Sequence, residues 1–190
     1  MHSVKLQGNH YKCTVAAVIS LLVLSSCSVQ KHSNASHPAV KKTNTASASS
    51  LKFYQQKYAP LLGTSPSAIT NLKLYQFIDD WMYVPYKYGG ISKTGVDCSG
   101  LSALLLHEVY GKEISGSSAD ICNQTIPITE DKLKEGDLVF FKINSSTVSH
   151  MGVYLANDRF IHASTHGGVI ISNLDDDYYR KYFSVAGRLK

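Results

Sequence analysis

The chain has little cysteine and no long apolar run. Four cysteines in 190 residues are too few for a small domain held together by disulfides. The longest nearly apolar stretch covers residues 13–24, shorter than the roughly 20 residues that a relaxed transmembrane helix needs. Internal repeats are also missing from the sequence. Because 44% of the residues are hydrophobic, these absences leave one folded domain of ordinary size, with or without a tail.

Acidic residues are missing from the first 50 positions, and this absence explains the net charge of +5. Residues 51–190 hold 14 basic and 14 acidic residues, so this part of the chain is formally neutral. The basic character belongs to the N-terminal segment and gives no support for a nucleic-acid partner. The whole surplus comes from five lysines: Lys5, Lys12, Lys31, Lys41 and Lys42.

The N-terminus has the architecture of an export signal. A basic start precedes the apolar run 13–24, and small residues follow it. The ending Leu24-Ser25-Ser26-Cys27 resembles the bacterial motif that is cleaved immediately before a cysteine destined for lipidation. We therefore expect residues 1–26 to be a lipoprotein signal peptide and Cys27 to carry the lipid that anchors the exported protein to a membrane. The alternative is an ordinary signal peptide cut nearby, with Cys27 incidental.

Residues 27–50 are predicted to be the lipidated cysteine followed by a flexible tether. Between positions 28 and 50 there is no aromatic or acidic residue, and 14 of the 23 residues are Ser, Thr, Asn or Ala. Such a segment cannot bury enough apolar area to order itself. We expect the anchored protein to face the periplasm or cell wall, and by analogy Ser28 favours the outer membrane.

Residues 51–190 predict an α+β domain. Apolar spacing indicates helices over 51–62, 71–82 and 97–111, with a short capped helix at 117–120. A β-rich part follows, and because short turns separate several of its strands, the sheet of about five strands should be mostly antiparallel with the helices packed on it. The expected strands cover 138–143, 148–155, 159–164, 168–172 and 184–189, with a short helix at 175–183 before the last.

Cys98 is a candidate nucleophile because it lies at the expected start of a helix that follows a glycine-rich stretch. The free backbone N–H groups and the helix dipole favour an anion there, and this setting lowers the pKa of a thiol. For a cysteine taken alone, however, a buried structural role is more common.

Two histidines on adjacent predicted strands change that balance. If the turn pairs Tyr154 with Phe160, then His150 and His162 become diagonal neighbours on one face of the sheet, and Gly152 leaves room for their rings. A slip of one residue would place them on opposite faces. Cys98 could then attack a carbonyl, with His150 as general base and His162 as the residue that orients it. A Cys-His-His zinc site and a pair of ordinary core histidines remain alternatives.

The motifs resemble the NlpC family of cell-wall cysteine peptidases. The similarity covers roughly residues 72–189 and implies a papain-like fold and hydrolysis of peptide bonds in peptidoglycan stem peptides. It assigns the catalytic roles to Cys98, His150 and His162. It is carried by Tyr86 with Gly89-Gly90, by Asp97-Cys98-Ser99-Gly100, by Gly136–Phe141, by Ser149–Leu155 and by Phe160–Ser164.

The resemblance also implies substrate contacts. Tyr86 would line the oxyanion side of the cleft, and Asp97 and Ser99 would meet the polar end of the stem peptide. Ser117 matches a further family serine, but Ser115-Gly116 stands where many relatives have Pro-Arg or Arg. For Asp97 and Ser117 themselves, helix capping is an equally good interpretation.

We therefore expect a membrane-anchored peptidoglycan endopeptidase that acts as a monomer and needs no metal or cofactor. Its partners would be peptidoglycan stem peptides and, through Cys27, the membrane. One alternative is a catalytically degenerate lipoprotein of the same fold that binds peptidoglycan or activates another enzyme. Another is the same fold acting as an amidase or acyltransferase on a different amide.

Overall fold

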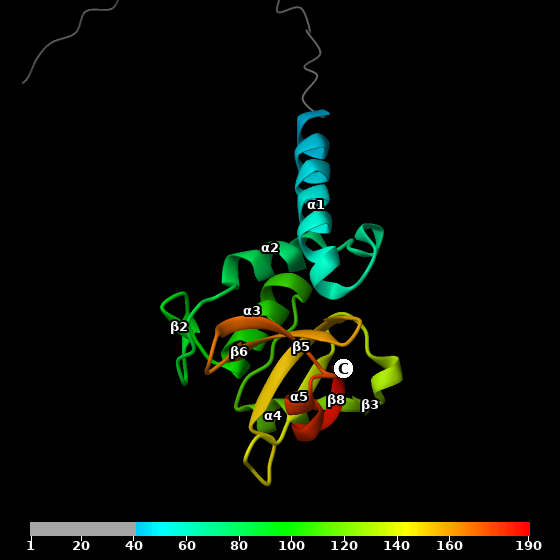
Figure 1. Ribbon diagram of the computed structural model, residues 1–190. Coiled ribbons are helices and arrows are strands. Elements are labelled where there is room, and N and C mark those ends of the chain that lie inside the picture. Colours follow the sequence, from blue (N-terminus) through cyan, green and yellow to red (C-terminus); the bar gives the residue numbers. More distant parts are fainter. Residues whose placement is uncertain (1–40) are drawn as a thin grey trace, which may run out of the picture. The chain divides into compact units, whose positions relative to one another are not determined.

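The computed structural model describes residues 41–190 (Figure 1). The expected signal peptide, Cys27 and most of the tether lie outside the described residues. No helix within the described part is long and apolar enough to cross a membrane. The helices are α1 (Lys41–Leu62), the 3₁₀ turn η1 (Pro66–Ala68), α2 (Leu72–Trp81), α3 (Cys98–Tyr110), α4 (Ser118–Asn123), the 3₁₀ turn η2 (Glu130–Lys132) and α5 (Asp177–Tyr182).

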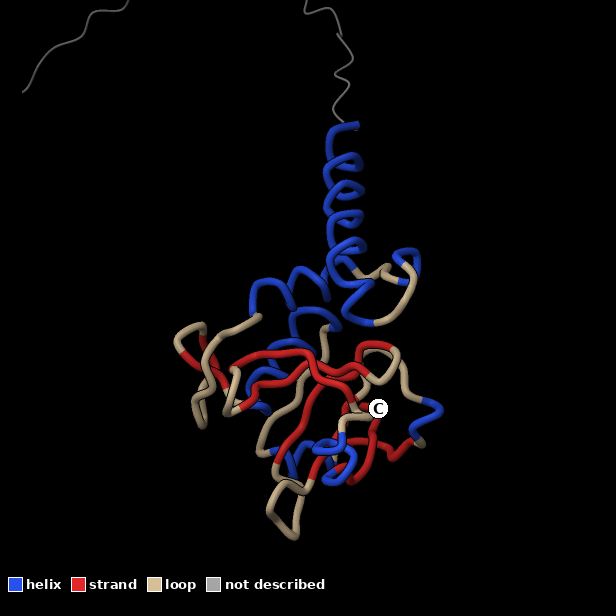
Figure 2. Tube along the Cα trace, in the orientation of Figure 1, coloured by secondary structure: helices blue, strands red, loops and turns tan. Residues whose placement is uncertain are grey.

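The strands form one sheet of six and a small pair, as Figure 2 shows in red. The large sheet has the order β3-β8-β4-β5-β6-β7, and each neighbouring pair is antiparallel. The α+β class and the mostly antiparallel sheet are thus confirmed. The strands are β1 (Ile91–Ser92), β2 (Gly95–Val96), β3 (Thr125–Ile128), β4 (Leu138–Phe141), β5 (His150–Ala156), β6 (Arg159–Ser164), β7 (Gly168–Asn173) and β8 (Phe183–Leu189).

Strand β3 and helix α1 are two of the elements that differ from the expectation. Strand β3 was not expected, because Pro127 interrupts its short apolar pattern. Proline is tolerated there because β3 is an edge strand that pairs only with β8. Helix α1 begins at Lys41 instead of residue 51, so the last ten residues of the expected flexible tether are helical.

Three polar side chains begin helices as the sequence indicates. Asn71 accepts from the backbone N–H of Leu74, and Asp97 accepts from that of Gly100. Ser117 accepts from Asp120 N, while the Asp120 carboxylate accepts from Ser117 N in a reciprocal capping box. These caps fix where each helix starts, and for α3 this is the position of Cys98.

The large sheet is covered on both faces. Side chains along β4 alternate between two clusters: Leu138 and Phe140 pack with the core of α1–α3, while Val139 and Phe141 pack in a second cluster. Tyr179 of α5 belongs to that second cluster. A strand buried on both faces loses the alternation of polar and apolar residues, and β4 accordingly reads Leu-Val-Phe-Phe.

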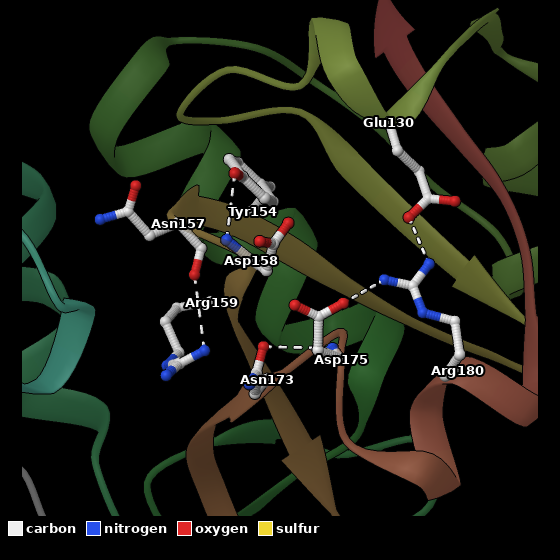
Figure 3. Close-up of polar contacts among 8 residues, drawn as sticks. All are labelled: Glu130, Tyr154, Asn157, Asp158, Arg159, Asn173, Asp175 and Arg180. Atoms are coloured by element: carbon white, nitrogen blue, oxygen red, sulfur yellow. Dashed lines mark hydrogen bonds and ion pairs between the residues drawn. The ribbon is translucent and has the colours of Figure 1, made fainter.

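The turn between β5 and β6 sets the register that the site requires. Tyr154 pairs with Phe160 as predicted, with an irregularity between Tyr154 and Ala156. Asn157 and Asp158 both have left-handed backbone conformations in this turn, which Asn and Asp tolerate better than most residues. The Asp158 N–H donates to the Tyr154 hydroxyl at 3.2 Å (Figure 3). The turn therefore fixes which face each β5 and β6 side chain occupies.

The segment leading to Tyr86 is held against the end of β7. Tyr83 N donates to Val169 O at 2.8 Å, and Val169 N donates to Val84 O at 2.9 Å. Gly168 makes this approach possible: its φ is +66°, and a Cβ there would lie 2.3 Å from Val84 O.

We predict that Gly168→Ala lowers the free energy of unfolding by about 2 kcal/mol or more, because a left-handed alanine costs about 1–2 kcal/mol and the new methyl group clashes with backbone. Gly167→Ala is the matched control, since a Cβ there would meet only the Ile170 side chain, at 3.3 Å. Urea denaturation of both variants measures the difference. Equal stabilities for the two would contradict the close approach.

Candidate active site

Cys98 is the first residue of α3 and is 7% exposed. Its sulfur lies 3.4 Å from the Ser118 hydroxyl oxygen at the start of α4. Backbone hydrogen bonds from Met151 and Ser99 also favour its thiolate. Because Met151 follows His150 on β5, the thiol is held beside the strand that carries the first histidine.

Burial raises the pKa of the Cys98 thiol, and the nearby Asp97 carboxylate adds to this effect. The hydrogen bonds from Ser118, Met151 and Ser99 act in the opposite direction but do not outweigh it. The expectation that the helix start lowers this pKa is therefore wrong, because desolvation penalises the thiolate more than the local donors favour it. In the resting site, Cys98 is a neutral thiol.

His150 and His162 meet as the predicted register requires. His150 Nε2 and His162 Nδ1 are 2.8 Å apart, and the two rings are nearly perpendicular at 86°. Gly152 permits this contact, because a Cβ there would lie 3.1 Å from His162 Cβ and 2.7 Å from Ile161 O. Aromatic rings flank the pair: Phe141 lies beside His150, and Phe160 stacks on His162 at 4.9 Å between centroids.

Both imidazoles are neutral near pH 7. Burial lowers the pKa of His150 to about 4. Burial, and then the neighbouring His150, lowers the pKa of His162 well below its ordinary value. A hydrogen bond between two neutral imidazoles needs one N–H and one lone pair, so the tautomers of the two rings depend on each other.

Tyr86 lies where two hollows of the surface meet. A hollow of about 420 Å³ lies on the Cys98 side, and one of about 580 Å³ lies on the histidine side. Tyr86 and Ser149 line both. Burial raises the pKa of Tyr86, and its proximity to Cys98 raises that pKa further, so the hydroxyl stays protonated beside the thiol.

The residues expected to contact substrate through polar groups are engaged in capping. Asp97 accepts from Ser99 Oγ at 3.0 Å and from Gly100 N at 2.7 Å through one oxygen, and from Gly89 N at 2.7 Å through the other. Ser117 donates its hydroxyl proton to Asp120 at 2.6 Å. Although these side chains line the hollow beside Cys98, the contacts favour the capping interpretation.

A metal site is not formed by these residues. Within the described range 41–190, no group of three His, Cys, Asp or Glu side chains is arranged to hold a metal ion. Cys98 and Cys122 are both free thiols, and Cys122 is half-buried in α4. Among the contacts of the described residues, His150 bonds to His162 and Cys98 to Ser118, and none joins Cys98 directly to a histidine.

Three residues of the site escaped the sequence analysis: Ser118, Ser172 and Tyr179. Ser172 Oγ lies 2.9 Å and Tyr179 OH 3.1 Å from His162 Nε2. Ser172 could have been found from the pairing of β6 with β7, since it pairs with Phe160, two residues before His162 on the same face. Tyr179 comes from a separate helix, and no spacing in the sequence indicates its contact.

Comparison with known proteins adds to the geometry. The NlpC/P60 family matches residues 83–188. A protein of Escherichia coli K12 named murein DD-endopeptidase MepS/murein LD-carboxypeptidase is 31% identical over 175 residues, which cover 92% of this chain and 90% of the relative. The probable endopeptidase NlpC of the same organism is 38% identical over 113 residues, covering 59% of this chain and 73% of that protein.

A solved structure supports the fold. The crystal structure of an NlpC/P60 family protein from Bacillus cereus ATCC 10987 matches with a TM-score of 0.56 and 24% identity. The match covers 63% of this chain and 40% of that one. At this identity the similarity concerns the fold.

The neutral histidines predict a loss of stability in acid. Because the folded pKa of His150, about 4, lies below its unfolded value of about 6.5, its contribution is present above pH 6.5 and is lost as pH falls towards 4. At 1.36 kcal/mol per unit, this amounts to about 3 kcal/mol. His150→Asn should therefore reduce the fall in unfolding free energy between pH 7 and pH 4 by about that amount, measured by urea denaturation.

The matched control is His166→Asn, which removes an exposed imidazole and should leave the pH dependence unchanged. Parallel curves for the wild type and His150→Asn would show that His150 is not buried in its neutral form.

Proposed function

Because the chain belongs to the NlpC/P60 family, we propose that it is a cysteine peptidase that hydrolyses an amide bond in peptidoglycan stem peptides or their cross-links. The observation that carries the proposal is the contact between His150 and His162 on the strands beside a buried Cys98. The names of the two Escherichia coli relatives support peptidoglycan as the substrate.

The contacts suggest a division of roles. His150 Nε2 is occupied by His162, which leaves His150 Nδ1 to accept the proton of the Cys98 thiol. As the sulfur attacks the carbonyl carbon, that proton passes to His150, and His150 then gives it to the amine that leaves. Water, deprotonated by His150, then attacks the thioester carbon, and His150 returns that proton to the sulfur as the acid is released. His162 orients His150 throughout and stabilises its protonated form.

The neutral resting state suits this sequence of steps. Neither a thiolate nor an imidazolium is favoured before substrate arrives, because burial opposes both charges. Charge develops only as the S–C bond forms, and the backbone N–H of Cys98 at the start of α3 would stabilise the negative oxygen. The Tyr86 hydroxyl, beside Cys98 and at the junction of the two hollows, is a further donor for it.

Binding alone explains the site less well. A degenerate peptidoglycan-binding protein would have no need for a buried thiol and two buried, mutually bonded histidines. Each of the three positions carries a residue capable of its chemical role, so we favour the enzyme.

We further propose that the protein is exported and lipid-anchored at Cys27 as a monomer. The support is the signal architecture of residues 1–27, and the neutral catalytic part gives no reason for a different partner. Two or three acyl chains on one residue anchor stably, since each buried CH₂ contributes about 0.8 kcal/mol. An enzyme tethered to a membrane suits a substrate that is a large, immobile polymer.

Cys98→Ala should reduce the release of muropeptides from purified sacculi by about 10³-fold or more, because it removes the nucleophile. Cys122→Ala is the matched control, since it removes the other described thiol and should retain full activity. Mass spectrometry of the products identifies the bond. Comparable digestion by Cys98→Ala and the wild type would contradict the role of Cys98 as the nucleophile.

Cys27→Ser should abolish incorporation of a labelled fatty acid and shift the protein from the membrane to the soluble fraction of a bacterial host. Cell fractionation with immunoblotting measures the shift. Cys13→Ser, within the expected signal peptide, serves as control and should leave the mature protein in the membrane fraction. A Cys27→Ser protein that stays labelled and sedimenting would exclude Cys27 as the anchor.

A further inference from the structure

His162 Nε2 faces two hydroxyl groups on the side away from His150. Ser172 Oγ of β7 lies 2.9 Å from it and Tyr179 OH of α5 lies 3.1 Å from it. The two hydroxyls also contact each other, with Ser172 Oγ donating to Tyr179 OH at 3.3 Å. The three groups therefore form a closed triangle behind the orienting histidine.

The contact from Ser172 to Tyr179 gives this triangle its direction. A serine hydroxyl has one proton, and Ser172 gives it to Tyr179. What Ser172 turns towards His162 Nε2 is then a lone pair, so Nε2 must carry the proton and donate it. A neutral imidazole has a single N–H, so His162 Nδ1 is left as an acceptor.

The proton position on His162 determines that on His150. His162 Nδ1 accepts from His150 Nε2 across 2.8 Å, so the single proton of neutral His150 is on Nε2. His150 Nδ1 is then the free lone pair that a general base needs. The orientation of the Ser172 hydroxyl on β7 thus determines, through the two imidazoles, which nitrogen of His150 lacks a proton.

We infer that Ser172 and Tyr179 are positioning residues that select the productive tautomer of His162 and, through it, of His150. The inference rests on the proposed function for its catalytic consequence, while the tautomers themselves are a property of the resting protein. Neither residue touches the reacting atoms in this scheme, and both act through His162.

Tyr179 is held firmly enough for this role. Its ring packs against Phe141, Phe160 and His162, with centroids 5.5, 5.0 and 5.3 Å away. Burial raises the pKa of Tyr179, so its hydroxyl stays neutral. Its neighbour Arg180 joins α5 to the rest of the domain through ion pairs with Glu130 and Asp175 (Figure 3).

Loss of Ser172 alone should do more than remove a contact. Tyr179 OH is itself within 3.1 Å of His162 Nε2, and without Ser172 it can donate there. His162 would then carry its proton on Nδ1 and donate to His150 Nε2, which leaves the proton of His150 on Nδ1. A base that already holds a proton at that atom cannot accept one from Cys98, so removing both hydroxyls should harm activity less than removing Ser172 alone.

The direct test is ¹⁵N NMR of histidine-labelled full-length protein at pH 7, where two-bond correlations tell a protonated ring nitrogen from a bare one. In the wild type, both His150 and His162 should carry the proton on Nε2 alone. Ser172→Ala should move the His162 proton to Nδ1, Tyr179→Phe should give both forms, and Ser172→Thr should restore the wild-type pattern. Tyr178→Phe is the matched control and should leave the pattern unchanged, since Tyr178 is an exposed neighbour on α5.

A wild-type protein with His162 protonated on Nδ1 would overturn the inference. So would an unchanged Nε2–H pattern in both Ser172→Ala and Tyr179→Phe. Should Ser172→Ala fail to fold, Tyr179→Phe decides by itself, because a single Nε2–H form in that variant contradicts the selection. These readouts do not depend on the substrate, so failure of the proposed function is recognised separately, as a wild type that releases no muropeptides.

Kinetics on sacculi test the catalytic consequence. Ser172→Ala should lower kcat by about 10²-fold or more with little change in KM, since a wrong tautomer removes the base. The double variant Ser172→Ala/Tyr179→Phe should be about tenfold faster than Ser172→Ala, because no donor then competes for His162 Nε2. A double variant slower than Ser172→Ala would mean that the two hydroxyls only add packing and hydrogen bonds.

Discussion

The hydrogen bond between His150 and His162 is the interaction on which the site depends, and it exists only under three conditions. The two residues must share a face of the sheet, which the pairing of Tyr154 with Phe160 ensures. The backbones must approach closely, which Gly152 allows. At least one ring must be neutral, because two imidazolium groups have four donors and no lone pair between them. The register of β5 and β6, the lack of a side chain at Gly152 and burial therefore all determine one contact of 2.8 Å.

Burial is the condition that links the fold to the chemistry. Aromatic rings on the second face of the sheet remove water from the histidines, and the core under α3 removes it from Cys98. The pKa values of the acid and the base consequently move apart, the thiol upward and the imidazole downward. Such a pair is uncharged in the resting protein. The low dielectric that opposes these charges at rest also strengthens the interaction between nearby dipoles and the charges that develop during the reaction. Stability in acid is lower as a result, since a buried imidazole is protonated less easily than one in the unfolded chain.

Much of this arrangement follows from local patterns. Apolar runs separated by short turns located five strands, helix caps located the starts of α2, α3 and α4, and the parity of β5 against β6 brought the histidines together. What the sequence could not predict depends on packing between distant segments. Strand β3 forms at an edge where Pro127 is tolerated, and Tyr83 and Val84 reach β7 only because Gly168 has no side chain. The direction of the Cys98 pKa shift was also beyond the sequence, because it depends on how much of the core closes over the helix start.

The motif Asp97-Cys98-Ser99-Gly100 shows how much of a short pattern can serve the local fold. Both oxygens of Asp97 accept hydrogen bonds from Gly89, Ser99 and Gly100, and Ser99 gives its proton to Asp97.

Gly100 is needed because a Cβ there would lie 2.5 Å from Gly90 O. Three of the four residues thus use their polar groups, or their lack of a side chain, to lock the glycine-rich loop to the first turn of α3. Their common effect is to hold the Cys98 sulfur at one place against β5.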